Sequence, residues 1–228
     1  MRAGIGSQVW SGIVSLVFPV RTTCWGCGGE LAAQEPLFCL VCRQGFAAGL
    51  AGWDLTDDLI ARAWAVGPYQ GGLRRAVLAY KYSGKEYLAE PLGRLLAARL
   101  AGAVPGSCQV IPVPLHRTRR RQRGFNQAEA LAQVLGKELR LPVRADILVR
   151  RQATRPLSTL NHDNRHQELR GAFHVAWPGL PGTPVLLVDD VVTSGATVHE
   201  CAGVLRAAGY GPVYVATVCA VTDNCQRA

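Results

Sequence analysis

The sequence predicts an α/β fold, with a mainly parallel, twisted sheet flanked by helices and a small cysteine-bearing module at the N-terminus. Strand-like apolar runs alternate with amphipathic helical stretches beyond residue 60, which is the pattern of a parallel sheet covered by helices. The run Val185–Val188 is continuously apolar, as in a strand buried on both faces. Two Cys-x-x-Cys pairs precede residue 52. We therefore divide the chain into a module at 1–52 and an α/β domain at 60–228.

The alternation can be followed along the α/β domain. The expected strands are Ala61–Tyr69, Cys108–His116, Ala145–Val149, Ala172–Val175, Val185–Val188 and Val213–Val221. The expected helices are Leu73–Tyr82, Leu88–Leu100, a helix opened by Asn126, and Val198–Ala208. The elements within 61–100 are expected beside the main sheet, which the later strands form.

Local signals mark the segments between these elements. Asn126 is a good N-cap, and Glu129 three residues later completes a capping-box pattern. The Gly/Ala-rich and then acidic stretch Gly45–Asp58 is expected to be a linker. Arg150–Arg170 is long, polar and without periodicity, which favours a functional lid.

Two carboxylates and a small-residue loop follow the run Val185–Val188. Asp189 and Asp190 come first, and after two valines the loop 193–197 leads into a helix. Backbone N–H groups of such a loop and of a helix N-terminus favour phosphate. Carboxylates so close to phosphate would repel it unless they faced another part of the ligand, and ribose hydroxyls are the natural target. The order favours a ribose 5-phosphate site; the alternative is a buried strand with a polar exit turn.

This stretch resembles the ribose-phosphate signature of type I phosphoribosyltransferases, with Asp-Asp, two apolar residues and Thr-x-Gly-x-Thr after an apolar strand. It lacks the glycine spacing of a P-loop or a dinucleotide fold. The resemblance implies that Asp189 and Asp190 hold the ribose hydroxyls of phosphoribosyl pyrophosphate (PRPP). In an enzyme that uses PRPP with Mg²⁺ the two aspartates are the candidate catalytic residues; Asp190 could act as a general base, although diol binding alone explains it. The remaining PRPP-binding residues would be Val191, Thr193, Ser194, Gly195, Ala196 and Thr197, and those from Thr193 to Thr197 would bind the 5-phosphate.

The positive charge is concentrated in one region. The chain has a formal net charge of +9, and residues 116–170 contribute 13 Lys/Arg against 5 Asp/Glu. Such a field suits an anionic ligand, which includes pyrophosphate, a nucleotide or nucleic acid. A solvated face is the alternative. The candidate ligands for pyrophosphate or nucleic-acid phosphates are His116, Arg117, Arg119, Arg120, Arg121 and Arg123. For His116 the alternative, which we favour, is a histidine whose hydrogen bonds are satisfied within its loop.

Four cysteines form the array C-x2-C, eleven residues, C-x2-C, and they are Cys24, Cys27, Cys39 and Cys42. Two such pairs can bring four thiolates to a tetrahedron around one structural Zn²⁺. Disulfides and a redox pair are the alternatives. Cys201 and Cys219 fall in apolar runs and are expected in the core, while Cys108 and Cys225 share no metal-binding spacing.

Several pieces together resemble the ComF (ComFC-like) competence family over nearly the whole chain. They are the first Cys-x-x-Cys after Phe18-Pro19, Tyr69…Leu73…Lys81-Tyr82, Val113-Pro-Leu-His116, Arg123-Gly-Phe-Asn-Gln127, Thr154, Gly171-Ala-Phe173 and the Asp-Asp signature. The resemblance implies a zinc ribbon joined to a phosphoribosyltransferase domain, with a role in DNA uptake during natural transformation. The family pattern defines no phosphoribosyl acceptor. Leu157 and Glu168 depart from the pattern, and both lie in the expected lid.

Two classes of function are therefore expected. An enzyme would displace pyrophosphate from PRPP with a nitrogen nucleophile, while Mg²⁺ and guanidinium groups stabilise the leaving group. A binding protein would sense PRPP or carry single-stranded DNA, and would act with competence proteins. We expect a cytoplasmic protein, because no segment has the roughly 20 apolar residues of a membrane span and Gln8–Val20 lacks a cleavage site for a signal peptide.

Overall fold

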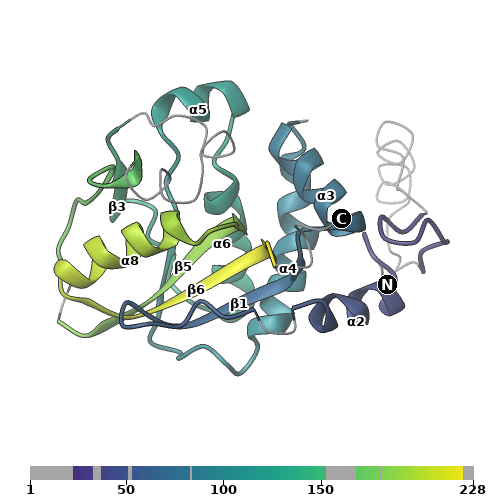
Figure 1. Cartoon of the computed structure of the whole chain (residues 1–228), viewed down its shortest axis with the longest axis horizontal. Coiled ribbons are helices and arrows are strands. Elements are labelled where there is room, and N and C mark those ends of the chain that lie inside the picture. Colours follow the sequence, from purple (N-terminus) through teal and green to yellow (C-terminus); the bar gives the residue numbers. More distant parts are fainter. Residues whose placement is uncertain are drawn as a thin grey trace, which may run out of the picture.

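Strand β5 (Thr183–Val192) lies inside a four-stranded sheet of order β1-β6-β5-β2. The other strands are β1 (Ile60–Pro68), β2 (Gln109–Pro112) and β6 (Tyr210–Ala220), and all three pairings are parallel. In Figure 1 the yellow β6 can be followed between β1 and β5. The computed structural model describes residues 23–32, 37–50, 53–82, 84–152, 168–179 and 181–222. The predicted parallel sheet is confirmed.

The two faces of the sheet carry separate layers of core, because successive side chains of a strand point to opposite faces. Leu186 and Val188 of β5 belong to one buried cluster, which includes the apolar sides of helices α3 (Gly71–Tyr82), α4 (Ala89–Leu100) and α6 (Gln127–Leu139). Val185 and Leu187 belong to the other, which includes helix α8 (Ala196–Ala207). Helices therefore cover both faces, as predicted (Figure 1).

Shorter elements complete the description. Helix α2 (Leu40–Ala48) packs against β1, a 3-10 turn η1 (Glu86–Leu88) precedes α4, and helix α5 (Arg117–Arg123) follows β2. The buried Cys201 and Cys219 confirm the prediction that these thiols are core residues. No helix in the described part of the chain has the length and apolar character needed to cross a membrane.

The strand predicted at Ala145–Val149 is placed differently. Strand β3 (Leu148–Arg150) is short and pairs antiparallel with β4 (Phe173–Val175), outside the main sheet. An ion pair within the turn, from Arg144 to Asp146 at 3.0 Å, precedes it. Just before this segment, Val143 forms an isolated parallel bridge with Val110 of β2 in the main sheet. The first predicted strand, in contrast, is a member of the main sheet as β1.

Two further findings correct the sequence prediction. Asp189 and Asp190 lie within β5, because the strand continues to Val192 instead of ending at Val188. The arginine-rich segment 117–123, which lies between the predicted strands and helices, is itself the helix α5. The ring of His116 accepts the amide of Thr118 at its start, and Gly124, with a φ of 84°, ends it.

The predicted linker Gly45–Asp58 is built into the fold. Its first residues complete α2. Trp53 and Leu55 pack against the buried cluster that includes α8, as does Leu59 directly after the predicted linker. Most of the predicted lid, from 153 to 167, lies outside the described residues, as do Gln8–Val20 and Cys225.

Candidate functional site

A cleft of about 750 Å³ lies at the carboxyl ends of β2 and β5. These adjacent strands are followed by helices on opposite faces, since α6 packs with one buried cluster and α8 with the other. In open parallel sheets such a switch of direction leaves a crevice that binds ligands. The walls come from the ends of α3, β2, β3 and β5 and from α5 and α6, so residues far apart in sequence face one space.

Asp189, Asp190 and Lys81 form a charged cluster in the cleft. Asp190 is only 6% exposed, and its Oδ1 lies 2.8 Å from Nζ of Lys81, whose side chain is 17% exposed. Burial disfavours the charged amine, but the carboxylate of Asp190 outweighs it and raises the pKa of Lys81 above its usual value. Burial, and then the charge of Asp190, raise the pKa of Asp189 to about 7. One cation thus faces two carboxyl groups.

The predicted phosphate loop forms a small hollow of its own beside this cluster. About 20 Å³ is enclosed by residues from Asp189 to Val198, the predicted PRPP-binding residues Val191, Thr193, Ser194, Gly195, Ala196 and Thr197 among them. Gly195 is the N-cap of α8 with a left-handed φ of 78°, and no side chain caps the helix there. The first amides of α8 therefore remain available to an anion.

Gly195 is required at this position for two reasons. Its positive φ favours glycine. A Cβ added there would lie 2.8 Å from Cδ1 of Leu55 and 3.0 Å from Nδ1 of His199. The crowding is thus at the back of the loop, where residues 53–59 pack, and not on the side of the hollow.

The arginine segment separates into two faces once it is helical. Arg119 and Arg123, four residues apart, line the cleft together with Gln122. Arg117, Arg120 and Arg121 are exposed and are not among the lining residues. Arg120 forms an ion pair with Glu129 at 3.4 Å, and His116 caps the helix. Of the six predicted basic ligands, the structure brings two to the cleft.

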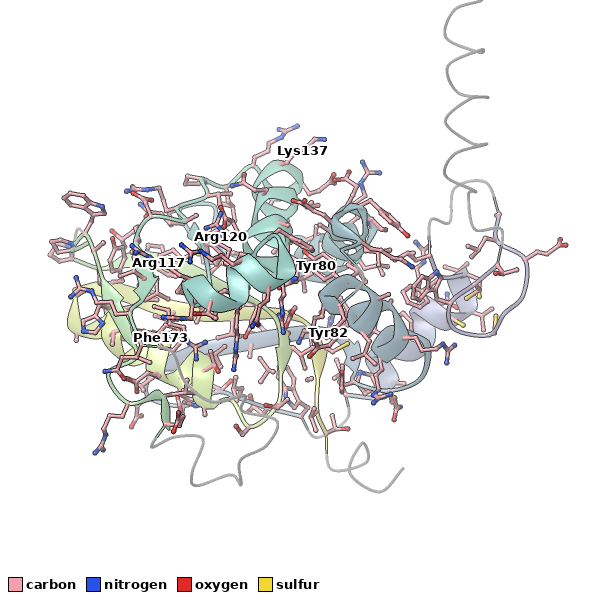
Figure 2. The ribbon with its side chains drawn as sticks, turned by 90° about the horizontal axis from the view of Figure 1, so that it is seen from above. Tyr80, Tyr82, Arg117, Arg120, Lys137 and Phe173 are labelled. Atoms are coloured by element: carbon pink, nitrogen blue, oxygen red, sulfur yellow. The ribbon has the colours of Figure 1, made fainter. Side chains whose placement is uncertain are left out.

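Figure 2 looks down on α5, with Arg117, Arg120 and Tyr82 in view. Tyr82 lines the cleft, is 71% exposed, and its ring centre lies 5.4 Å from the guanidinium of Arg123. Arg150, at the end of β3, is another cation on the lining and stacks over Phe173 at 5.1 Å. The cationic side of the cleft therefore combines α5 with β3.

The residues that line the cleft but were not assigned to the site from sequence include Lys81, Tyr82, Gln127 and Arg150. The first three occur in segments that carry the ComF resemblance, which is the signal that pointed to them. Gln127 is 1% exposed, and its Oε1 accepts a hydrogen bond from Arg123 at 3.0 Å.

The predicted N-cap of α6 is confirmed, since Oδ1 of Asn126 accepts a hydrogen bond from the amide of Ala128. Nδ2 of Asn126 donates to the carbonyl of Val113. Helix α6 and the end of β2 are tied together there.

The four predicted cysteines are brought together at the opposite end of α3 from Lys81. Their sulfur atoms all lie within 4.8 Å of one another, and Figure 2 shows sulfur atoms gathered in the N-terminal module. Sγ of Cys27 and Sγ of Cys39 are 3.8 Å apart, which is about the separation of two thiolates on one tetrahedral zinc. The cluster fits a metal with thiolate ligands.

Backbone groups around Cys24 also suit a thiolate. The amides of Gly26 and Cys39 donate to its Sγ at 3.2 and 3.3 Å. Burial works against the charge, but these hydrogen bonds prevail and lower the pKa of Cys24 to about 6. A Cβ at Gly26 would lie 2.5 Å from Sγ of Cys42, so the turn has room for glycine alone.

Several curated proteins are similar to this chain in sequence. No protein-family model matches the chain. Competence protein F of Haemophilus influenzae is 32% identical over 159 residues, which cover 66% of this chain and 69% of that protein. The DNA utilization protein YhgH of Escherichia coli O157:H7 is 32% identical over 163 residues, covering 69% and 71%. Competence protein ComFC of Bacillus subtilis is 23% identical over 210 residues, covering 85% and 82%.

Among solved structures, an adenine phosphoribosyltransferase of Trypanosoma brucei in complex with AMP, pyrophosphate and ribose-5-phosphate is similar over 65% of this chain and 58% of its own. The TM-score is 0.42 and the identity 13%. The matches to competence protein F and YhgH are much more similar in sequence, at 32% identity over about two thirds of each chain. Because of these two matches, the chain belongs to the ComF family of competence and DNA utilization proteins.

Proposed function

We propose that the cleft binds PRPP or a related ribose phosphate, and that the protein acts through this ligand in DNA uptake. The observation that carries the proposal is the order of groups along β5 and α8. Two carboxyl groups that line the cleft precede an uncapped helix N-terminus that begins with a left-handed glycine, and Asp189, Thr193 and Thr197 line both the cleft and the hollow of the loop. Carboxylates accept hydrogen bonds from a sugar diol, and the amides receive a phosphate.

The basic residues of the cleft supply the place for a pyrophosphate. Arg119, Arg123 and Lys81 line it together with the carboxyl groups, so a ligand with two anionic ends has a donor for each. If the bound ligand reacts with a nitrogen nucleophile, negative charge develops on the departing pyrophosphate, and these donors stabilise it. Asp189 and Asp190 are the acidic residues among those that line the cleft, and their oxygens suit the Mg²⁺ that would accompany PRPP and neutralise its charge.

The cysteine cluster has a separate, structural role in this proposal. With four thiolate ligands a Zn²⁺ has no open position for a substrate. The cluster lies on α3, where Arg75 donates to the carbonyl oxygens of Trp25 and Gly26. We therefore assign it to holding the N-terminal module on the α/β domain.

Calorimetric titration with ribose 5-phosphate tests the ligand directly. We expect the wild type to bind it, and its 2,3-dideoxy analogue to bind about tenfold to a hundredfold more weakly, because charged hydrogen bonds contribute roughly 1.5–3 kcal/mol each. Equal affinity for the two sugars would show that Asp189 and Asp190 do not read the diol. Absence of binding by ribose 5-phosphate and by PRPP with Mg²⁺ would contradict the proposal as a whole.

A second candidate is a protein that binds single-stranded DNA without catalysis, favoured by the exposed arginines on the outer face of α5. Two double variants distinguish these candidate functions. Each variant removes two positive charges from α5. We expect Arg119→Ala with Arg123→Ala to weaken PRPP binding at least tenfold, because both residues line the cleft. Arg117→Ala with Arg121→Ala, which removes exposed charges, should leave PRPP binding within about twofold.

DNA binding by the same two variants completes the comparison. If the outer face carries single-stranded DNA, the exposed pair will flatten the dependence of DNA affinity on salt, by about 1.4 units of slope for two lost phosphate contacts. Equal loss of PRPP binding in both variants would mean that α5 acts through its overall field and not through the cleft.

A further inference from the structure

His199, in the first turns of α8, contacts an acceptor with each nitrogen of its ring. Nδ1 lies 2.9 Å from the carbonyl oxygen of Gly195, the glycine that begins the helix. Nε2 lies 2.7 Å from Oδ2 of Asp57, which is 142 positions away in the sequence. The ring thus bridges the back of the phosphate loop and the segment before β1, and neither the sequence signature nor the lining of the cleft includes it.

Asp57 is itself held in place. Its Oδ1 accepts the amides of Leu59 and Ile60 at 2.9 and 2.8 Å, and its own amide donates to the carbonyl of Ile60. Ile60 begins β1, so the anchor of the ring is attached to the sheet. Burial would raise the pKa of Asp57, but these amides and His199 lower it, so the carboxyl is ionised at neutral pH.

The protonation state of the ring follows from its two partners. A carbonyl oxygen has no proton to donate, and an ionised carboxylate has none either. A neutral imidazole carries one N–H and satisfies one of the two contacts. The imidazolium carries two, so it is the form that donates to both Gly195 and Asp57 at these distances.

We propose that His199 is a positioning residue of the phosphate loop: as an imidazolium it ties the carbonyl of Gly195 to Asp57 and holds the loop in the shape that receives a phosphate dianion. The inference rests on the proposed ribose-phosphate site. Leu55 supports the same geometry, because its Cδ1 lies 2.8 Å from where a Cβ of Gly195 would be. A cation behind the helix N-terminus also adds to the attraction that the helix dipole exerts on an anion.

The charged groups on the surrounding elements favour the cation. Asp57 contacts the ring, and the same segment carries the exposed Asp54 and Asp58. On α8 itself, Glu200 accepts the amide of Gly171. Asp189 lies on the far side of the phosphate loop in β5, and Arg206, two turns along α8, is turned toward Gly211.

Nitrogen-15 spectra of the imidazole rings test the clamp without any ligand. In the wild type at pH 7.5 both nitrogens of His199 should carry a proton, and His199→Gln identifies the signals by their loss. In Asp57→Asn the proton on Nε2 should exchange faster with solvent, because its carboxylate acceptor is removed. A His199 ring with a proton on only one nitrogen, or a proton on Nε2 that exchanges alike in the Asp57→Asn variant, would overturn the proposal.

Ribose 5-phosphate titrations measure the consequence for the loop. Between pH 7 and 9 the phosphate stays dianionic, since its second pKa is about 6. The wild type should bind about fivefold more tightly than His199→Gln at pH 7, with the difference gone at pH 9. His174→Gln is the matched control, because His174 is exposed on β4, and it should match the wild type. Asp189 titrates in all three proteins, so the difference between them isolates His199.

The outcomes separate the two claims. Equal affinities of wild type and His199→Gln at pH 7 would overturn the positioning role even if the ring is protonated. A wild type that binds no ribose 5-phosphate at any pH would overturn the proposed function and the role of the clamp in it, while the spectra still decide whether the clamp exists.

Discussion

Serine at Cys24 should unfold the N-terminal module and release its metal. Thiolate ligation by Zn²⁺ contributes on the order of 10 kcal/mol to folding in zinc-finger peptides, so residues 23–32 and 37–48 are expected to lose their fold with it. The change removes the buried sulfur that accepts the amides of Gly26 and Cys39. Metal analysis should fall from about one zinc per chain to none.

The loss of the module should reach the α/β domain through α3. Trp25, Leu37 and Phe38 belong to the same buried cluster as Leu73 and Val77 of that helix. A Cβ at Gly72 would lie 2.2 Å from the carbonyl oxygen of Trp25, so the two parts are in close contact. We expect a lower melting temperature for the domain, with binding of ribose 5-phosphate kept, because Lys81 lies at the far end of α3.

Cys108→Ser is the control for the loss of a buried thiol. Cys108 is fully buried and is not one of the four clustered cysteines, so this variant should be destabilised but keep its zinc. A wild type that contains no metal when purified, and whose fold is unchanged by a chelator, would contradict the assignment of the cluster.

The sequence predicts the parts of the site that are written in consecutive residues. The carboxylates, the loop and the helix that follows it lie within nineteen residues, from Asp189 to Ala207. The spacing of the paired cysteines likewise indicates all four metal ligands. Local rules are enough there, because strand burial, helix N-termini and metal geometry act over short distances.

Long-range contacts are the part that the sequence does not predict. Lys81 reads as an ordinary lysine at the end of an amphipathic helix, and it meets Asp190 because β6 lies between β1 and β5 and α3 crosses toward the cleft. The pairing of His199 with Asp57 likewise depends on how the segment before β1 packs against α8.

The arginine helix shows a different limit. Its sequence has no apolar stripe, so its periodicity is invisible, although arginine and glutamine are good helix formers. The ends decide the structure, through the ring of His116 at the start and Gly124 at the end. Once the segment is helical, i to i+4 spacing selects which arginines face the cleft.

Asparagine at Asp189 and asparagine at Asp190 should change the stability of the ligand-free protein in opposite directions. Asp189 has a pKa of about 7 in the folded protein, above the 3.8 of an ordinary aspartate. Between these values the folded state holds a proton that the unfolded state has released, so stability falls as pH rises from about 4 to about 7. Asp189→Asn removes this cost, which is up to about 4 kcal/mol at pH 8, since one pKa unit corresponds to about 1.4 kcal/mol.

Asp190→Asn removes the partner of a buried cation instead. Lys81, whose side chain is 17% exposed, stays charged throughout this range because its pKa is raised. Breaking a buried ion pair from one side costs roughly 3–5 kcal/mol, and Asp189, which also attracts Lys81, offsets part of it, so we expect a loss of about 2 kcal/mol.

Urea unfolding at pH 5 and pH 8 measures both effects. The gain from Asp189→Asn should be larger at pH 8 than at pH 5, while both variants should bind ribose 5-phosphate at least tenfold more weakly. A substitution that stabilises the fold and removes the ligand marks a residue kept for binding at a cost in stability. If both variants lose stability alike, the two carboxyl groups share Lys81 equally. The charged form of Asp189 would then not destabilise the folded protein, which would contradict the prediction.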